Sequence, residues 1–257
     1  MRPVPECWRT TNASLVLLLA DAMIHNVDQK TPVVRLTHPN LRTGGSLEVA
    51  QHAAGSAGFR PDTSSVLWAC GRHLANHLCE APELIQGKRC IELGAGIGLT
   101  GIAAAALGAS EVVLTDVPAA MSLLRANAAA ASASHEGCRL IAQELLWGEQ
   151  AHIEQALSRG AYEVVLGADI LYFQSKEDVV KLVATMDGLL AAGGAVLLAY
   201  EWREDWETTD AFHCECAARG LHSEQRPLRA PLGEVDEDEA VLLFVSRGGS
   251  DATAAIF

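Results

Sequence analysis

Four glycines lie close together in the stretch CIELGAGIGLTG, which runs from Cys90 to Gly101. They follow a short apolar run, and glycine lets a backbone turn tightly and approach a ligand closely. The glycines can be read in two ways. G-I-G-L-T-G, beginning at Gly96, fits the dinucleotide-binding pattern, with the acidic residue Asp116 about 20 residues further on. E-L-G-A-G-I-G, beginning at Glu92, instead places three glycines in one turn directly after a strand.

The acidic residues near this turn favour the second pattern. A carboxylate at Glu92 would repel a pyrophosphate, but it would suit a cofactor that carries an ammonium group. S-adenosyl-L-methionine (SAM) has an ammonium group, a sulfonium group and no phosphate. Asp116, which ends the next predicted strand, can accept hydrogen bonds from both ribose hydroxyls. The stretch therefore predicts a SAM site.

A further acidic residue, Asp169, directly follows the apolar segment AYEVVLGA. A charge at the end of a buried strand is costly unless it is solvated, paired or used in chemistry. Asp169 is therefore a candidate for the reacting part of the site.

Strands and helices alternate along the part of the chain that carries these residues. Strands are predicted at 88–93, 111–116, 138–145, 161–169, 195–200, 221–228 and 240–247. Helices are predicted at 66–78, 99–107 and 119–131. A fourth helix begins with a capping box at Ser175 and is ended by Gly193 and Gly194. A fifth follows the strand 195–200 and runs to about Arg219, where Gly220 ends it. This alternation predicts an α/β fold with a doubly wound, mostly parallel seven-stranded sheet. Ligands of such sheets bind beyond the carboxyl ends of the strands.

Three regions are expected in the 257-residue chain. Residues 1–62 form an N-terminal extension that packs on the core and contains a hairpin, because VVRLTH and SLEVAQH alternate apolar and polar residues around PNLRTGG. Residues 63–247 form the SAM-binding domain. Residues 248–257 form a flexible tail.

Composition limits the partners. The formal net charge is −13, which argues against a nucleic-acid-binding protein and agrees with a basic protein partner. No apolar run is long enough to span a membrane. The seven cysteines include no C-x-x-C pair and indicate reduced thiols of an intracellular protein. No metal site is expected, because Cys214 and Cys216 would point to different faces of a helix.

Five short motifs together resemble a known family. They are VLW (66–68), ELGAGIG (92–98), VLTD (113–116), LLWG (145–148) and GADILY (167–172). In this combination they resemble the seven-strand, SAM-dependent protein-lysine methyltransferases of the "methyltransferase 16" type, over residues 64–246.

The resemblance implies a role for each matching residue. Asp169 and Tyr172 correspond to the D-x-x-Y pair at the target amine. The cofactor-binding positions are Trp68, Glu92, Gly94, Ala95, Gly96, Gly98, Asp116, Trp147 and Ala168. Leu146 departs from the pattern, since the family often has an aspartate there. The resemblance also implies a non-histone protein substrate, such as a chaperone or a translation factor, and a monomer that acts in the cytoplasm and also in the nucleus.

Three other functions are considered. An NAD-dependent oxidoreductase would need a catalytic Tyr or His, and no Y-x-x-x-K motif supplies one. A nucleic-acid N-methyltransferase usually has a D-P-P-Y-like tetrad, where this chain has Ile170 and Leu171. An inactive domain could bind partners through the acidic segment 234–239, although the acidic residues at positions 92, 116 and 169 argue against loss of activity.

Overall fold

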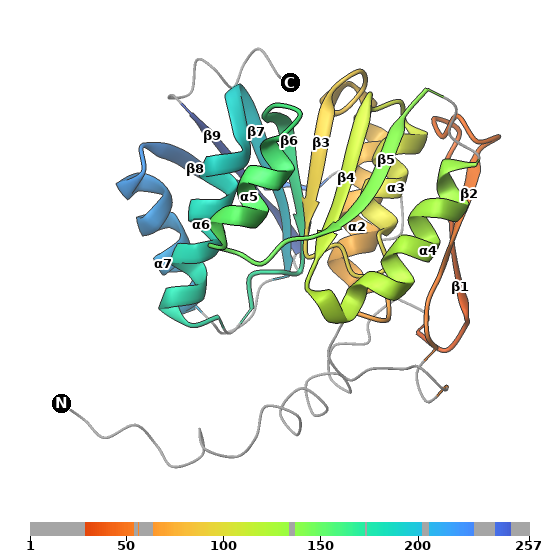
Figure 1. The fold of residues 1–257 in the computed structure, drawn as a ribbon, viewed down its shortest axis with the longest axis horizontal. Coiled ribbons are helices and arrows are strands. Elements are labelled where there is room, and N and C mark those ends of the chain that lie inside the picture. Colours follow the sequence, from red (N-terminus) through yellow and green to blue (C-terminus); the bar gives the residue numbers. More distant parts are fainter. Residues whose placement is uncertain are drawn as a thin grey trace.

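The structure, a computed structural model, describes residues 29–53, 56, 64–133, 137–172, 174–201, 206–228 and 240–247. A seven-stranded sheet forms the centre of the molecule, helices cover both of its faces, and a two-stranded hairpin lies at one side (Figure 1). Outside the described residues lie residues 1–28 of the predicted N-terminal extension, the predicted domain boundary at 62, the acidic segment 234–239 and the predicted tail 248–257.

The order of strands in the sheet is β5-β4-β3-β6-β7-β9-β8. The strands are β3 (Arg89–Leu93), β4 (Glu111–Asp116), β5 (Arg139–Glu144), β6 (Tyr162–Ala168), β7 (Leu190–Glu201), β8 (Leu221–Pro227) and β9 (Ala240–Arg247). Strands β3 to β7 pair in parallel, and β9 runs antiparallel between β7 and β8. This confirms the predicted doubly wound, mostly parallel fold.

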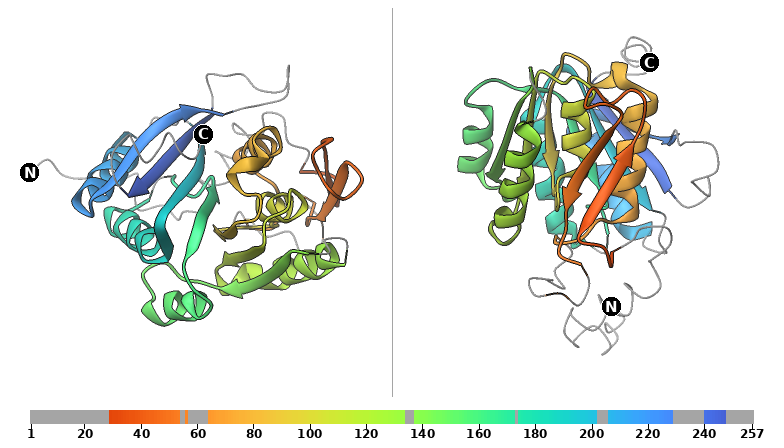
Figure 2. Two further views of the ribbon diagram at one scale, coloured as in Figure 1. Left: turned by 90° about the horizontal axis from the view of Figure 1, so that it is seen from above. Right: turned by 90° about the vertical axis from the view of Figure 1, so that its right-hand side faces the viewer.

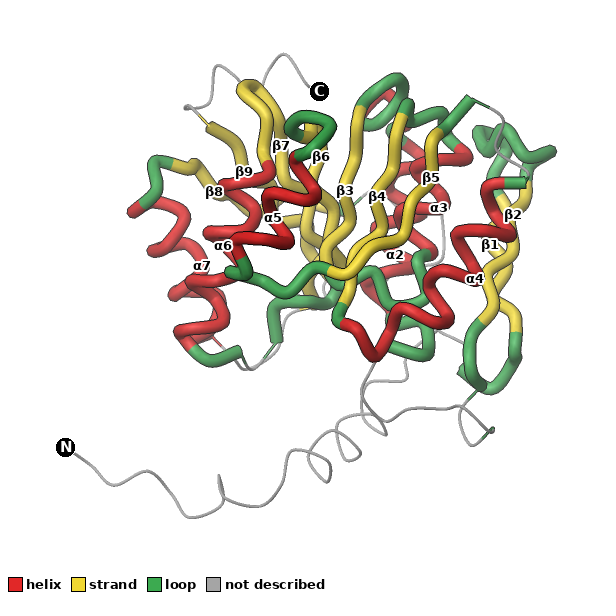
Figure 3. Tube along the Cα trace, in the orientation of Figure 1, coloured by secondary structure: helices red, strands yellow, loops and turns green. Residues whose placement is uncertain are grey.

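Two hydrophobic cores lie on opposite faces of the sheet, because successive side chains of a strand point to opposite faces. One face is covered by α2 (Ala69–Glu80), α3 (Leu99–Ala106) and α4 (Met121–Ser132). The other is covered by α5 (Gln150–Leu157), α6 (Lys176–Leu189) and α7 (Trp206–Ala218). Two short 3₁₀ helices, η2 (Pro82–Leu84) and η3 (Pro118–Ala120), lie before β3 and α4. Figure 2 shows both layers from above, and Figure 3 distinguishes the strands from the helices.

The predicted N-terminal hairpin is confirmed as β1 (Val33–Thr37) and β2 (Ser46–Ala50), which pair antiparallel. Its alternation places Val34, Leu36, Leu47 and Val49 in the core on the α2–α4 face, and its other residues outward. The hairpin stands beside α4 at the edge of the molecule (Figure 2).

The capping box at the start of α6 is also confirmed. The backbone N–H of Asp178 donates to Ser175 Oγ, which satisfies one of the free amides of the first turn. The predicted end of this helix is wrong, because α6 ends at Leu189 and Gly193 and Gly194 belong to β7. A Cβ on Gly194 would lie 2.9 Å from the carbonyl oxygen of Glu163, so glycine here lets β7 approach β6.

One further boundary and one whole helix differ from the prediction. Helix α2 begins at Ala69, three residues later than expected, because Trp68 has an extended conformation. Helix α5 was not predicted; it is eight residues long and buries only Ile153 and Ala156, so its apolar period is too short to see in the sequence.

None of the helices in the described part of the chain has the length and hydropathy needed to cross a bilayer. The described cysteines are all free thiols. Of the HCEC stretch, Cys214 is exposed and Cys216 is buried, as expected for two positions on different faces of one helix.

Candidate active site

The glycine turn connects β3 to α3 at the carboxyl edge of the sheet. Strand β3 ends at Leu93, and Gly94, Gly96 and Gly98 have φ angles of 61°, 54° and 86°. These angles favour glycine, so all three glycines are used in the turn, as the pattern that begins at Glu92 predicted. The turn is tied to β4, since the N–H of Ala95 donates to the carbonyl of Thr115 at 2.9 Å.

Gly101, the last glycine of the dinucleotide pattern, has a different function. It lies inside α3, where a Cβ would come within 2.2 Å of Leu114 Cδ2 and 2.8 Å of Glu92 Oε2. Glycine at this position therefore lets α3 pack directly on the sheet, rather than shaping the turn.

Glu92 lies behind the turn. It is only 2% exposed, because it shares the α3-facing side of β3 with Cys90. Its Oε2 accepts a hydrogen bond of 2.9 Å from the N–H of Gly101. Burial raises the pKa of this carboxyl group to about 8, against the opposing effect of the hydrogen bonds from Gly101 and Thr100. Glu92 thus joins β3 to the first turn of α3, and its contact with the ammonium group of SAM stays a prediction.

Asp116 ends β4, directly beside the turn. Its Oδ2 accepts from the N–H of Gly96 at 2.7 Å, and its Oδ1 accepts from the N–H of Val117 at 2.7 Å. These two bonds hold the carboxylate in one orientation at the strand end. A carboxylate oxygen can accept more than one hydrogen bond, so both oxygens are able to accept from ribose hydroxyls as well.

Asp169 follows β6, the strand on the other side of β3. Strand order reverses between β3 and β6, and ligands of doubly wound sheets bind at such a switch point. Asp169 has a φ of 57°, and it is the one non-glycine residue with a positive φ in the described part of the chain. Its N–H donates to the carbonyl of Ala199 on β7 at 3.0 Å.

The other predicted residues surround the same edge. The backbone before Trp68 passes the turn, since Ser64 O lies 3.5 Å from the Cβ position of Gly96. On the other side of the turn, Trp147 Cζ2 lies 4.0 Å from the Cβ position of Gly94. Trp68, Trp147, Ala168 and Tyr172 are all half-buried.

These residues fit SAM. The turn has no side chain at its three glycines, and a Cβ on Gly94 would come within 2.6 Å of Ile170, so the backbone there is closely packed and shaped by glycine. The carboxylate of Asp116 lies beside the turn, and it suits ribose hydroxyls or a cationic ligand better than a pyrophosphate.

Two functional contacts were not foreseen from the sequence. Asn127 on α4 donates to the carbonyls of Ala50 and Ile97, both at 2.9 Å, and so joins the hairpin to the glycine turn. The sequence did contain a signal for this contact, because Asn127 is a polar residue within an alanine-rich helical segment.

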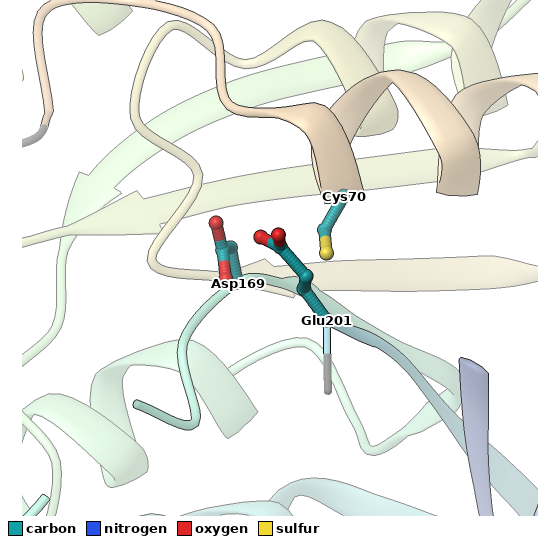
Figure 4. Close-up of side chains that lie close together, drawn as sticks. All are labelled: Cys70, Asp169 and Glu201. Atoms are coloured by element: carbon teal, nitrogen blue, oxygen red, sulfur yellow. The ribbon is translucent and has the colours of Figure 1, made fainter. Parts of the chain in front are cut away.

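The second contact brings Glu201 and Cys70 to Asp169. The sulfur of Cys70 and one carboxylate oxygen each of Asp169 and Glu201 all lie within 4.8 Å of one another. In Figure 4 the carboxyl groups of Asp169 and Glu201 lie side by side, and Cys70 points toward them from α2. Glu201 follows AVLLAY, so its position at a strand end was visible in the sequence, but its neighbours were not.

Comparison with known proteins identifies the family. The model of a family described as "Lysine methyltransferase" matches residues 56–212. The chain belongs to this lysine methyltransferase family. The match includes the glycine turn, Asp116 and the D-x-x-Y pair, and the family accounts for the resemblance seen in the motifs.

Curated relatives of the family support the same assignment. The chain is 34% identical to protein N-lysine methyltransferase METTL21A of Danio rerio over 160 residues, which cover 62% of this chain and 70% of that protein. It is 30% identical to EEF1A lysine methyltransferase 3 of Mus musculus over 190 residues, or 74% of this chain and 75% of that protein. With METTL21A of Mus musculus it shares 32% identity over 136 residues, which span 53% of this chain and 60% of that protein.

Solved structures agree on the fold. The glycopeptide N-methyltransferase MtfA, complexed with sinefungin, superposes with a TM-score of 0.55 and 16% identity, over 71% of this chain and 96% of that one. MtfA has also been solved with SAM. The fold is therefore that of the SAM-dependent methyltransferases, and SAM is the cofactor of the family. These comparisons do not favour an NAD-dependent oxidoreductase or an inactive domain.

Proposed function

We propose that this protein transfers methyl groups from SAM to the ε-amino group of a lysine in a non-histone protein, with Asp169 and Tyr172 at the target amine. One observation carries the assignment of the amine site. Asp169 keeps a left-handed backbone, with φ of 57°, at the switch point beside the glycine turn. A non-glycine residue in this conformation is strained, and such strain is concentrated at functional sites.

The cofactor would be held by the glycine turn, by Asp116 at its ribose and by Trp147 beside its adenine. When bound, SAM supplies a methyl group on a sulfonium, which a nitrogen lone pair takes by direct displacement while the electrons of the S–CH₃ bond return to sulfur. The protein's own contribution is to hold that nitrogen in line with the bond, and orientation of this kind contributes on the order of 7–11 kcal/mol.

The target lysine must lose a proton before it reacts, because the ordinary pKa of its ammonium group is about 10.4. An apolar channel favours the neutral amine, whereas a nearby carboxylate favours the ammonium form. Asp169 therefore acts by accepting a hydrogen bond from the nitrogen and directing its lone pair. Tyr172 forms a wall of the channel and turns its ring toward the methylammonium product.

The substrate is proposed to be a basic surface of a chaperone or of a translation factor. The net charge of −13 supports a basic partner, and relatives named for EEF1A support a translation factor. We also propose that the protein is a monomer. We further propose that it acts in the cytoplasm and the nucleus, and the free thiols among the described cysteines agree with such reducing compartments.

Two variants test this function. Each is incubated with methyl-labelled SAM and a cell extract, and the labelled proteins are identified by mass spectrometry. Asp169→Ala is expected to abolish transfer while calorimetry shows unchanged SAM binding. Asp116→Ala is expected to weaken SAM binding itself by about tenfold or more, since it removes a charged hydrogen-bond acceptor.

The control is Glu154→Ala, which removes an exposed carboxylate from α5. Equal turnover by Asp169→Ala and the wild-type protein would refute the role of Asp169. Absence of methyl-lysine in the wild-type reaction would refute the function as a whole.

A further inference from the structure

Glu201 is the last residue of β7, the strand next to the one that leads into Asp169. Leu197 and Ala199 of β7 face the core beneath α2, α3 and α4, so strand alternation directs Glu201 to this same face. Cys70 is the second residue of α2 and is fully buried on that face. The fold therefore directs the side chains of Glu201 and Cys70 to one face, beside Asp169.

Both carboxyl groups lie within reach of a single nitrogen atom. The oxygens of Asp169 and Glu201 lie within 4.8 Å of each other. An N–H···O hydrogen bond is about 2.9 Å long between heavy atoms, so one nitrogen can reach both oxygens at once. Both carboxylic side chains are half-buried, and the sulfur of the buried Cys70 lies within 4.8 Å of both carboxyl groups.

We propose that Glu201 accepts a second hydrogen bond from the target amine, and that this hydrogen bond has its largest effect on the rate of the first methyl transfer to a lysine. This inference rests on the function proposed above. A neutral lysine amine has two N–H groups and one lone pair. If Asp169 and Glu201 each accept one N–H, the lone pair is left pointing away from both carboxylates and toward the methyl donor.

The need for the second acceptor decreases as methyl groups are added. A neutral monomethyl amine has one N–H, which Asp169 alone can accept, and a dimethyl amine has none. In each transfer the lone pair forms the new N–CH₃ bond, and the proton of the incoming ammonium has already been released to water. Glu201 is thus a positioning residue whose effect depends on the methylation state of the lysine.

The test compares Glu201→Ala and Glu201→Gln with the wild-type protein. Each full-length protein is incubated with SAM and a cell extract, and the proteins are then hydrolysed to amino acids. Mono-, di- and trimethyl-lysine are quantified over time by mass spectrometry. SAM affinity is measured in parallel by calorimetry, and Glu154→Ala is the control.

Glu201→Ala is expected to slow total methyl-lysine formation by about 10- to 100-fold, the range for a lost hydrogen bond to a charged group. The ratio of trimethyl- to monomethyl-lysine should rise, because only the first transfer is strongly impaired. Glu201→Gln keeps an oxygen acceptor and should stay within about threefold of the wild-type rate. SAM affinity should not change in either variant.

The inference would be overturned if Glu201→Ala formed methyl-lysine at the wild-type rate, or if Glu201→Gln and Glu201→Ala lost equal amounts of activity. It would also be overturned if the ratio of trimethyl- to monomethyl-lysine in Glu201→Ala stayed the same or fell, or if SAM affinity fell in parallel with activity. These outcomes leave the proposed function intact, provided that the wild-type protein forms methyl-lysine. If the wild-type protein forms none, the proposed function itself has failed.

Discussion

The carboxyl group of Glu92 makes the stability of this protein depend on pH in a way that can be worked out from its surroundings. Burial raises its pKa from 4.5 to about 8, and the negative charge of Asp116 acts in the same direction. The hydrogen bonds from Gly101 and Thr100 favour the charged form, but they are outweighed. The folded protein therefore holds this proton more tightly than the unfolded chain does.

The sign of the effect follows from this difference. The stabilisation is fully present below pH 4.5, and it is lost as the pH rises through the window from 4.5 to about 8. Within the window, each pH unit removes about 1.4 kcal/mol from the free energy of unfolding. Between pH 5 and pH 7.5, the titration of Glu92 should thus lower the free energy of unfolding by roughly 3 kcal/mol.

Glu92→Gln removes the titration and keeps an oxygen that can accept from the N–H of Gly101. As the pH rises from 5 to 7.5, the free energy of unfolding of the variant should therefore increase relative to that of the wild-type protein by roughly 3 kcal/mol. The measurement is urea unfolding of both proteins at several pH values in this range. Glu154→Gln, on the exposed surface of α5, controls for the loss of a carboxyl group. A difference between variant and wild type that stays constant with pH would refute the buried, protonated state of Glu92.

Three further variants test how the site is supported, and each is measured by urea unfolding. Gly101→Ala should destabilise the protein by about 1–3 kcal/mol, since its Cβ would lie 2.2 Å from Leu114; wild-type stability would show that α3 can move away from the sheet. Asn127→Ala should cost about 1–3 kcal/mol, because it leaves the buried carbonyl of Ile97 without its donor and also removes the bond to the carbonyl of Ala50; a smaller loss would mean that water replaces the side chain. Ser175→Ala should cost about 1 kcal/mol, and an unchanged midpoint would argue against its role as the cap of α6.

Local patterns in the sequence were sufficient for most of the elements and for the glycine turn. Strands buried on both faces read as continuous apolar runs, and helices between them have their own caps and breaks, so the sheet could be predicted segment by segment. The turn at Gly94, Gly96 and Gly98 was predictable because each glycine is required by the conformation of its own residue. The end of α6 was not predictable, since Gly194 is required by the approach of β6 and not by its own helix.

The amino-acid sequence by itself determined which residues stand at strand ends, because that depends only on the chain near each residue. It marked Asp116 and Asp169 in this way. Only the tertiary structure decided which side chains meet. Glu92 packs under α3 against Gly101, Asn127 joins the hairpin to the turn, and Glu201 lies beside Asp169. These contacts depend on the order of strands in the sheet and on the face to which each side chain points, and residues far apart in the chain meet only when the sheet is assembled.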